Sequence, residues 1–270
     1  MNSVLPYTSK LNKQNAYWMA LFSKEVYTCL SNSKKPDVKV IKQSLMAKDH
    51  KFQNVFGYDN NSAQAIVIEH SEYICVAFRG TDEIDDWLDN LKAFRTAQLF
   101  GEFHRGFWAS LIDVWQPILD KCDLLQRAHK RPIFFTGHSL GGAMATLAAA
   151  QFVHVDRPFT SVYTFGQPRT MDRASSQFFN SQCSTRFFRF HNNNDIVTRV
   201  PARVMGYSHV GTYLYISEEK DIHQEPGFWF RFMDFFDGAL SALKEEGIDA
   251  IEDHSMDKYL EAITEWDFKH

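Results

Sequence analysis

The sequence predicts an α/β fold with a largely parallel central sheet in a single domain spanning residues 1–270. Strand-like and helix-like segments alternate from residue 73 to residue 190, which is typical of strands joined by helical crossovers. In addition, the apolar run Ile133-Phe134-Phe135 leads through a glycine-rich turn directly into an alanine-rich run. A buried strand that turns at once into a helix is a building unit of such a sheet.

The other elements follow from periodicity and turn signals. Apolar residues from Met19 to Leu30 recur every three to four positions and predict an amphipathic helix. The nearly all-apolar segment 73–79 is expected to be a buried central strand. The expected order is a helix over 11–31, strands over 51–58, 63–69 and 73–79, a helix over 106–127, the strand and helix on either side of residue 139, a strand over 161–166, a helix to about 180, strands over 185–190 and 213–216, and helical segments over 228–246 and 248–264.

Composition is that of a soluble globular protein and argues against several classes. The formal net charge is −4 and no basic tract is present, which argues against nucleic acid as a partner. No apolar run approaches the roughly 18 residues that cross a membrane. No signal peptide is evident, so we expect a protein that is cytoplasmic, or secreted without a recognisable signal peptide. The four scattered cysteines are expected to be free thiols.

Ser139 is the candidate nucleophile. It stands at the strand-to-helix turn in Gly137-His138-Ser139-Leu140-Gly141. Such a turn holds the hydroxyl out above the sheet, and the flanking glycines leave room for the bend. The following helix directs its N-terminal amide groups towards an oxyanion formed at the serine. The alternative, a tight turn whose serine only caps the helix, leaves the two glycines without a reason.

A serine nucleophile needs a base, and the base needs an acid that orients it. Asp195 lies just past the strand over 185–190, and catalytic groups of such sheets lie beyond the carboxyl ends of strands. Of the four histidines that follow Asp195, the last is the final residue and another lies in a charged surface stretch. The choice between the remaining two, His209 and His254, stays open on spacing and chemistry alone.

The oxyanion requires two hydrogen-bond donors. One is the backbone amide of Leu140, next to the nucleophile, and the second is expected from a loop after an earlier strand. The segment Phe78-Arg79-Gly80-Thr81 fits this description, with the amide or hydroxyl of Thr81 as the donor. The same residues also suit an ordinary turn at the end of a strand.

A short amphipathic segment follows this loop. Its apolar residues share one helical face, opposite its acidic residues: Ile84, Trp87, Leu88 and Leu91. We expect a lid over approximately 82–96 that covers the site in water and turns outward at a lipid surface, with an ordinary packed helix as the alternative. A further aromatic segment over 228–236 is expected to be core, with an acyl groove or an interface as alternatives.

Taken together, these motifs resemble the class 3, fungal-type lipases of the α/β-hydrolase superfamily. The matching segments run in the family's order over roughly residues 65–260: Phe-Arg-Gly-Thr at 78–81, Asp86-Trp87-Leu88, His104-Arg105-Gly106-Phe107, Gly-His-Ser-Leu-Gly-Gly at 137–142, Thr164-Phe165-Gly166-Gln167-Pro168-Arg169 and Asn194-Asp195-Ile196-Val197. The resemblance implies the α/β-hydrolase fold with a short helical lid over approximately 82–96. It also implies an oxyanion hole formed by Thr81 and Leu140.

The resemblance further implies which histidine is the base. Family members carry a non-catalytic Tyr-x-His segment after the acid, and their base lies in an Asp-His motif near the C-terminus that an aromatic residue follows. Asp253-His254, with Tyr259 downstream, is similar to this motif. The implied catalytic set is therefore Ser139, Asp195 and His254, with His209 as a supporting residue.

The implied activity is a serine ester hydrolase that cleaves acylglycerol, triacylglycerol-type, esters through an acyl-enzyme, without a cofactor or metal. The expected partner is a lipid or other ester substrate at a lipid–water interface. A phospholipase A1 and a soluble-ester carboxylesterase are the alternative enzymes. A non-catalytic lipid-binding relative is the alternative from another class, and an intact catalytic set argues against it. Secreted fungal members carry a signal peptide and disulfides that are not found here, so the chain is more similar to the intracellular or bacterial branch.

Overall fold

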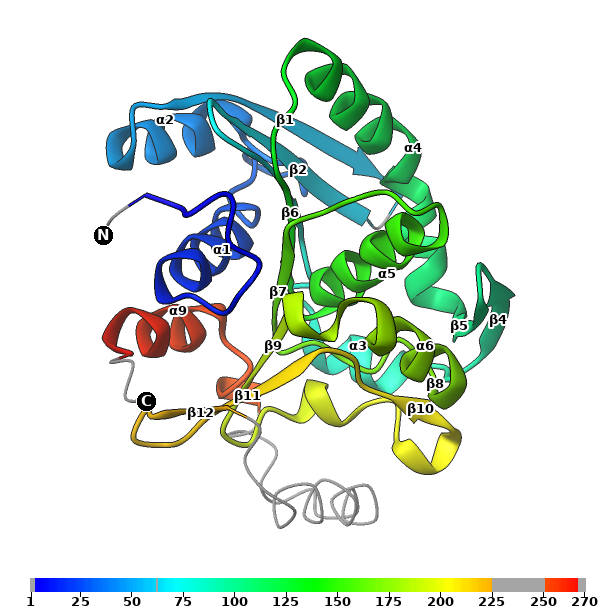
Figure 1. The fold of residues 1–270 in the computed structure, drawn as a ribbon. Helices are drawn as coiled ribbons and strands as arrows, with labels where there is room; N and C mark the ends of the chain where they lie inside the picture. Colours follow the sequence, from blue (N-terminus) through cyan, green and yellow to red (C-terminus); the bar gives the residue numbers. More distant parts are fainter. Residues whose placement is uncertain (1–2, 62, 225–250, 267–270) are drawn as a thin grey trace.

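A large sheet runs through the centre of the molecule in the computed structural model, which describes residues 3–61, 63–224 and 251–266 (Figure 1). Its strand order is β1-β2-β3-β6-β7-β9-β11-β12. Strands β3, β6, β7, β9 and β11 pair in parallel, and antiparallel strands close both edges. The strands are β1 (Phe52–Asn60), β2 (Ala63–His70), β3 (Ile74–Phe78), β6 (Ile133–His138), β7 (Ser161–Phe165), β9 (Phe187–Asn192), β11 (Thr212–Ile216) and β12 (Ile222–Gln224). The predicted fold class, with its mostly parallel sheet, is confirmed.

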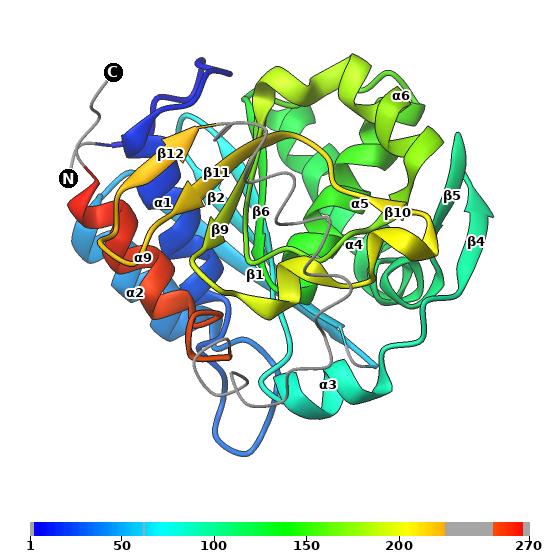
Figure 2. The same cartoon turned by 90° about the horizontal axis from the view of Figure 1, so that it is seen from below.

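Helices cover both faces of this sheet. Figure 2 shows α1 (Lys13–Glu25), α2 (Val38–Lys48) and α9 (Met256–Glu265) on one side, and α4 (Arg105–Ala128), α5 (Leu140–His154) and α6 (Arg173–Cys183) on the other. Successive side chains of a strand point to opposite faces. In β3, Val76 therefore joins the core under α4 and α5, whereas Cys75 joins the core under α1. Because both faces are covered, the central strands are apolar throughout.

A small second sheet and a short helix lie beside the ends of the central strands. The second sheet has the order β10-β8-β5-β4, formed by β4 (Arg95–Gln98), β5 (Gly101–His104), β8 (Met171–Asp172) and β10 (Tyr207–Ser208). Helix α3 (Ile84–Asn90) precedes β4. Parallel neighbours β3 and β6 end at the same edge, so the loop after β3 and the turn containing Ser139 lie together.

Some predicted elements differ from the observed ones. The predicted helix over 11–31 ends at Glu25, and a separate helix, α2, begins after the Asp37 cap. The predicted helix over 248–264 is interrupted at residues 253–255, and α9 begins at Met256 after the Ser255 cap. This interruption places His254 in a turn rather than on a helix. The segments 228–246 and 228–236 lie outside the described residues.

All four cysteines lie within the described ranges and are free thiols. Within these ranges, no helix has both the length and the apolar character needed to span a membrane.

Candidate active site

Ser139 lies at a strained turn between β6 and α5. Its backbone has a φ of 58° and a ψ of −130°, a conformation that costs energy for a residue with a side chain. The turn is tight, because a Cβ on Gly137 would lie 2.8 Å from the Gly142 nitrogen and one on Gly141 would lie 2.7 Å from the Phe78 carbonyl carbon. Both glycines of the motif therefore allow α5 to begin directly against β3 and β6. The serine side chain is fully buried.

Asp195 and His254 form a buried pair. Asp195 follows β9, and His254 lies in the turn before α9; Nδ1 of the ring is 2.9 Å from each carboxylate oxygen. The hydroxyl of Tyr259 donates to Oδ2 at 2.6 Å, and the backbone nitrogen of Val197 donates to Oδ1 at 2.9 Å. Because an ionised carboxylate only accepts, Nδ1 of His254 carries a proton. In the neutral ring, Nε2 is then the free acceptor.

The Asp195 carboxyl stays ionised despite its burial. Burial alone would raise its pKa, but the neighbouring His254 ring and the hydrogen bonds from His254 and Tyr259 outweigh this effect. The result is a pKa of about 2. A negative charge is therefore held in place to orient the histidine and to stabilise its protonated form.

His254 packs beside the turn that carries the serine. Its ring centroid lies 4.3 Å from that of His138, the residue directly before Ser139. Oγ of Ser139 and Nε2 of His254 are both buried, and neither has a hydrogen-bond partner among the described residues. Such hydrogen bonds are often long in unliganded enzymes and tighten when substrate binds.

Gly166 allows the pair to approach the turn. Its φ is +60°, and an added Cβ would lie 2.7 Å from Oδ2 of Asp195 and from Nδ1 of His254. The preceding residue, Phe165, accepts a hydrogen bond from the Ser139 nitrogen at 2.9 Å. Gly166 thus lies between the serine turn and the acid–base pair, a position that the Thr-Phe-Gly-Gln-Pro motif marks in the sequence.

The loop after β3 packs directly against the serine. A Cβ on Gly80 would lie 2.9 Å from Cβ of Ser139. Thr81 follows, and its hydroxyl accepts a hydrogen bond from the Glu83 nitrogen at 3.2 Å. Leu140 is the first residue of α5, and amide groups in the first turn of a helix lack intrahelical partners. The structure therefore brings both predicted oxyanion donors to the same turn.

A hydrogen-bonded chain that sequence reasoning missed connects this loop with His254. The Gly80 nitrogen donates to the Tyr27 hydroxyl at 3.1 Å, and that hydroxyl lies 2.9 Å from Nδ1 of His138. Nε2 of His138 lies 2.6 Å from the His254 carbonyl oxygen and must donate to it. Nδ1 is then the acceptor for Tyr27. Burial lowers the pKa of His138 to about 3, which keeps this ring neutral.

Asp253 joins the turn of His254 to the loop of Asp195. Its Oδ2 accepts from the Asn193 side chain at 3.0 Å and from the Asn194 nitrogen at 3.2 Å. Its carbonyl oxygen accepts from the Asn192 side chain at 2.9 Å. The polarity of the Asn192-Asn193-Asn194 run was the only sequence signal for these contacts, and it did not identify their partner.

Three of the four predicted lid residues lie on helix α3, and Leu91 follows its last residue. All four apolar residues (Ile84, Trp87, Leu88, Leu91) are half-buried. Trp87 stacks on Phe107 with ring centroids 5.9 Å apart, and Leu91 also packs against the core. Within the predicted lid range of 82–96, only residues 84–90 are helical, and residues 95–96 belong to β4.

His209 lies elsewhere. Its Nε2 is 2.7 Å from the Thr198 carbonyl oxygen, and it makes no hydrogen bond to Ser139 or Asp195 among the described contacts. The described residues contain no cluster of three His, Cys, Asp or Glu side chains suited to a metal ion.

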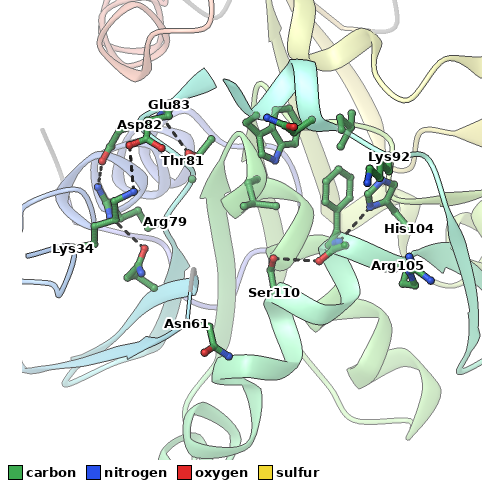
Figure 3. A pocket seen from close by; sticks show the side chains of 18 of the residues that line it. Lys34, Asn61, Arg79, Thr81, Asp82, Glu83, Lys92, His104, Arg105 and Ser110 are labelled. Carbon is green, nitrogen blue, oxygen red and sulfur yellow. Dashed lines mark hydrogen bonds and ion pairs between the residues drawn. The ribbon is translucent and has the colours of Figure 1, made fainter. Parts of the chain in front are cut away.

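Two cavities adjoin the oxyanion loop. The larger, about 570 Å³, is lined by Thr81, Leu140, Trp87 and Phe107 among others (Figure 3). The second, about 540 Å³, is lined by Thr81 and His254. Thr81 therefore lies between them, while the Ser139 side chain remains covered. Cavities of this size accommodate small organic ligands.

The sequence model of the family described as "Lipase (class 3)" matches residues 75–205. This range contains the strained serine turn, the oxyanion loop and Asp195. The chain is therefore similar to the class 3 lipases over these residues. The resemblance inferred from the motifs is thereby confirmed.

Curated relatives of this chain include fungal and plant proteins. "Secreted mono- and diacylglycerol lipase A" of Penicillium camembertii is 28% identical over 166 residues, covering 58% of this chain and 52% of that protein. "Lipase" of Rhizomucor miehei is 26% identical over 226 residues, covering 81% of this chain and 59% of that protein. "Phospholipase A(1) DAD1, chloroplastic" of Arabidopsis thaliana is 32% identical over 156 residues, covering 49% and 34%. The chain spans about half the length of the curated relatives it matches.

Solved structures with the α/β-hydrolase fold match this chain. The Rhizomucor miehei triacylglyceride lipase aligns with a TM-score of 0.62 and 23% identity, covering 75% of this chain and 79% of that one. Lipase II of Rhizopus niveus aligns with a TM-score of 0.64 and 21% identity, covering 76% and 81%. The predicted α/β-hydrolase fold is therefore confirmed.

The comparison with curated relatives contradicts the predicted cellular location. The sequence favoured a cytoplasmic protein, or one secreted without a recognisable signal peptide. Three of the relatives, from Penicillium and Fusarium, are named secreted lipases. The prediction depended on a missing leader and on unpaired cysteines, and neither feature reports directly on the compartment.

Proposed function

We propose that this chain is a serine ester hydrolase that cleaves acylglycerol esters through an acyl-enzyme. The observation that carries the proposal is the buried Asp195–His254 pair packed beside the strained turn of Ser139, with Nε2 of the histidine unengaged. A carboxylate-oriented imidazole beside a serine at a strand-to-helix turn is the arrangement that acyl transfer requires. We also infer that residues 1–270 act as one catalytic domain.

The proposed reaction follows from this arrangement. Nε2 of His254 takes the proton of Ser139 as Oγ attacks the ester carbonyl, and Asp195 stabilises the imidazolium that forms. The amides of Thr81 and Leu140 bind the oxyanion, and losing one such donor typically costs about 100- to 1,000-fold in rate. His254 then returns the proton to the departing alcohol. Water, activated by the same histidine, releases the fatty acid and restores Ser139.

The names of the relatives support an acylglycerol as the substrate. Two of the reported relatives are named for mono- and diacylglycerol or phospholipid hydrolysis. A phospholipase A1 is therefore the second candidate, favoured by the plant relative. Both reactions use the same residues and differ only in the group that leaves with the alcohol.

We further propose that residues 82–96 form a lid. Helix α3 rests on Phe107 through Trp87, and Ser139 is fully covered in this conformation. Displacing α3 would expose its apolar face and open the site, which is favourable at a lipid surface. The hydrolysis rate measured across the onset of substrate aggregation tests this proposal: an abrupt increase supports a lid, and a smooth saturation curve contradicts it.

The catalytic assignment is tested by labelling with a fluorescent phosphonate ester. Wild-type protein should be labelled, whereas Ser139→Ala should not be labelled and should lose p-nitrophenyl butyrate hydrolysis while keeping its circular dichroism spectrum. His254→Asn should lose activity to a similar degree, and His209→Asn should keep most of it. Full labelling of Ser139→Ala would reject the assignment of the nucleophile.

A further inference from the structure

The two sides of the larger cavity differ in their charged residues: one side has ion pairs, and the other has cations without an ion-pair partner among the described residues. On one side, Lys34 pairs with Glu83 at 3.7 Å and Arg79 pairs with Asp82 (Figure 3). On the other side lie Lys92 and Arg105, which have no ion-pair partner among the described residues. The chain as a whole has a formal net charge of −4, so two unneutralised cations on one cavity wall are a local feature.

The position of Arg105 is fixed by its backbone and by an aromatic ring. Its nitrogen donates to the Phe94 carbonyl oxygen at 2.8 Å, and its guanidinium lies over the Phe94 ring, 5.0 Å from the centroid. The guanidinium stacks on the ring through its flat face. The N–H donors along the edge of the guanidinium therefore remain available for a ligand. Lys92 precedes Phe94 on the same segment and also lines the cavity.

A buried histidine lies on the same wall. His104 is only 2% exposed, stacks on Phe107 and lines the cavity. Its Nδ1 accepts from the Phe107 nitrogen at 3.2 Å, so in the neutral ring Nε2 carries the proton. Burial lowers the pKa of His104 to about 4, although the Lys92 carbonyl partly opposes this, so the ring is neutral at pH 7. The Nε2–H group therefore faces the Lys92 carbonyl oxygen, although the contact does not have full hydrogen-bond geometry.

The N-terminus of α4 lies at the same place. This helix has 24 residues, and its first residues, Arg105, Gly106 and Phe107, all line the cavity. Amide groups in the first turn of a long helix carry partial positive charge and favour anions. Two exposed cations without an ion-pair partner among the described residues, a buried histidine and a helix N-terminus therefore converge on one wall.

We propose that this wall, formed by Lys92, His104 and Arg105, is a subsite for the anionic headgroup of a glycerolipid. The inference rests on the proposed function, because it places the headgroup in the cavity that Thr81 and Leu140 also line. The proposal requires the phosphodiester of a lipid to reach the cationic wall while its acyl carbonyl lies at those two donors. Ser139 then cleaves the carboxylic ester, the phosphodiester stays intact, and a lysophospholipid and a fatty acid leave.

The carboxylates near the cavity do not oppose an anion at this wall. Asp82 and Glu83 are the acidic residues that line the cavity among those described, and both are paired with cations on the opposite side. Asp86 and Asp89 on α3 are exposed and do not line it. The subsite therefore favours lipids with one net negative charge over neutral diacylglycerols.

A selectivity ratio tests the proposal in the enzyme itself. We would compare kcat/KM for monomeric short-chain phosphatidylglycerol with kcat/KM for the diacylglycerol of the same acyl chains. Replacing Arg105 or Lys92 with Gln should lower this ratio about tenfold, as expected for loss of one charge-assisted contact. The matched control is Lys130→Gln, which removes one positive charge at an exposed position beyond the other end of α4 and should leave the ratio unchanged. An equal ratio in wild type, Lys92→Gln and Arg105→Gln overturns the subsite. Ser139-dependent hydrolysis is still observed in that case, so the proposed function is not affected.

A binding measurement separates the two proposals and the two sources of phosphate. Calorimetric titration with sn-glycerol 3-phosphate, with glycerol as the neutral control, requires no turnover. Glycerol 3-phosphate binding that weakens about tenfold in each variant supports the subsite. If no Ser139-dependent hydrolysis of either lipid is detected, the proposed function is overturned, but this binding result still supports the subsite. Failure of wild type to bind glycerol 3-phosphate, or equal binding by the variants, overturns it. Binding of glycerol 3-phosphate without any preference for phosphatidylglycerol over diacylglycerol overturns the assignment to a lipid headgroup.

Discussion

At the scale of single residues, Gly166 controls the position of the acid–base pair. Replacing it with Ala places a methyl group 2.7 Å from both Asp195 and His254 in a backbone conformation with a φ of +60°. A displacement of about 1 Å in a catalytic group can cost about 100-fold in rate. We therefore expect Gly166→Ala to lower kcat for p-nitrophenyl butyrate at least 100-fold.

Gly206 provides a matched control for this substitution. Its φ is +84°, but an added Cβ would lie 3.5 Å from the nearest atom of Arg95, an ordinary contact. Both alanine variants should lose about 1 kcal/mol in free energy of unfolding from the backbone conformation. Only Gly166→Ala should lose activity, and comparable kcat values in the two variants would contradict the positioning role.

Asp195 makes the stability of the protein depend on pH in a defined window. Its pKa is lowered from 3.8 to about 2 in the folded state, so its contribution is present above pH 4 and is lost as pH falls towards 2. A difference of this size corresponds to about 2 kcal/mol. Urea denaturation of wild type between pH 6 and 3 should therefore show the free energy of unfolding falling below pH 4. Asp195→Asn should be less stable at pH 6 and should show a shallower fall, and identical slopes would contradict the prediction.

The sequence identified the candidate residues whose signal is local and missed those whose signal is not. Ser139 and Leu140 lie within one short motif, and Asp195 follows a recognisable strand. The choice of His254 over His209 required the family resemblance, because chain spacing does not report which turn meets the carboxylate. Tyr27 and Asp253 carry no motif, and their roles depend on contacts with residues far away in the chain.

At the scale of elements, Tyr27 connects the chain just after α1 with the loop after β3 and with the serine turn. Its hydroxyl accepts from the Gly80 nitrogen and lies beside Nδ1 of His138, whose other nitrogen contacts the His254 carbonyl. Tyr27→Phe should leave the Gly80 and His138 groups unpaired and loosen both the oxyanion loop and the His254 turn. We expect kcat to fall about tenfold with little change in KM, since the hydroxyl does not contact substrate in this proposal.

Exposed Tyr7 offers the same substitution without the contacts. It is 81% exposed, so Tyr7→Phe should have wild-type kcat and KM. If Tyr27→Phe raised KM tenfold and left kcat unchanged, its hydroxyl would be a substrate-binding group rather than a positioning group.

Element prediction succeeded where burial sets the pattern. The central strands were recognisable because both faces of the sheet are covered and the segments are apolar throughout. The interruption of the last helix at residues 253–255 was missed, because side-chain contacts of Asp253 with the Asn193 and Asn194 region compete with helical continuation there. Propensity alone does not report such distant partners.

At the scale of the whole molecule, the site is assembled from both faces of the sheet. Ser139 directly precedes α5 on one face, whereas His254 precedes α9, which packs against α1 on the other. Activity therefore requires α9 to remain docked, even when the rest of the core is intact. Regions of a protein can detach below the global unfolding transition when their local stability is lower.

A pair of isoleucines on opposite faces tests this dependence, in a Trp266→Phe background because this buried tryptophan caps α9 and would report its undocking. Ile263 in α9 and Ile118 in α4 are both fully buried, and replacing either with Ala should cost about 2–5 kcal/mol. In Ile263→Ala, increasing urea should abolish p-nitrophenyl butyrate hydrolysis before tryptophan fluorescence reports global unfolding, because undocking of α9 removes His254 from Asp195. In Ile118→Ala, activity and fluorescence should be lost together, since α4 carries none of the three catalytic side chains. Coincident loss of activity and fluorescence in both variants would show instead that α9 unfolds only with the entire molecule, and that the base is held as firmly as the nucleophile.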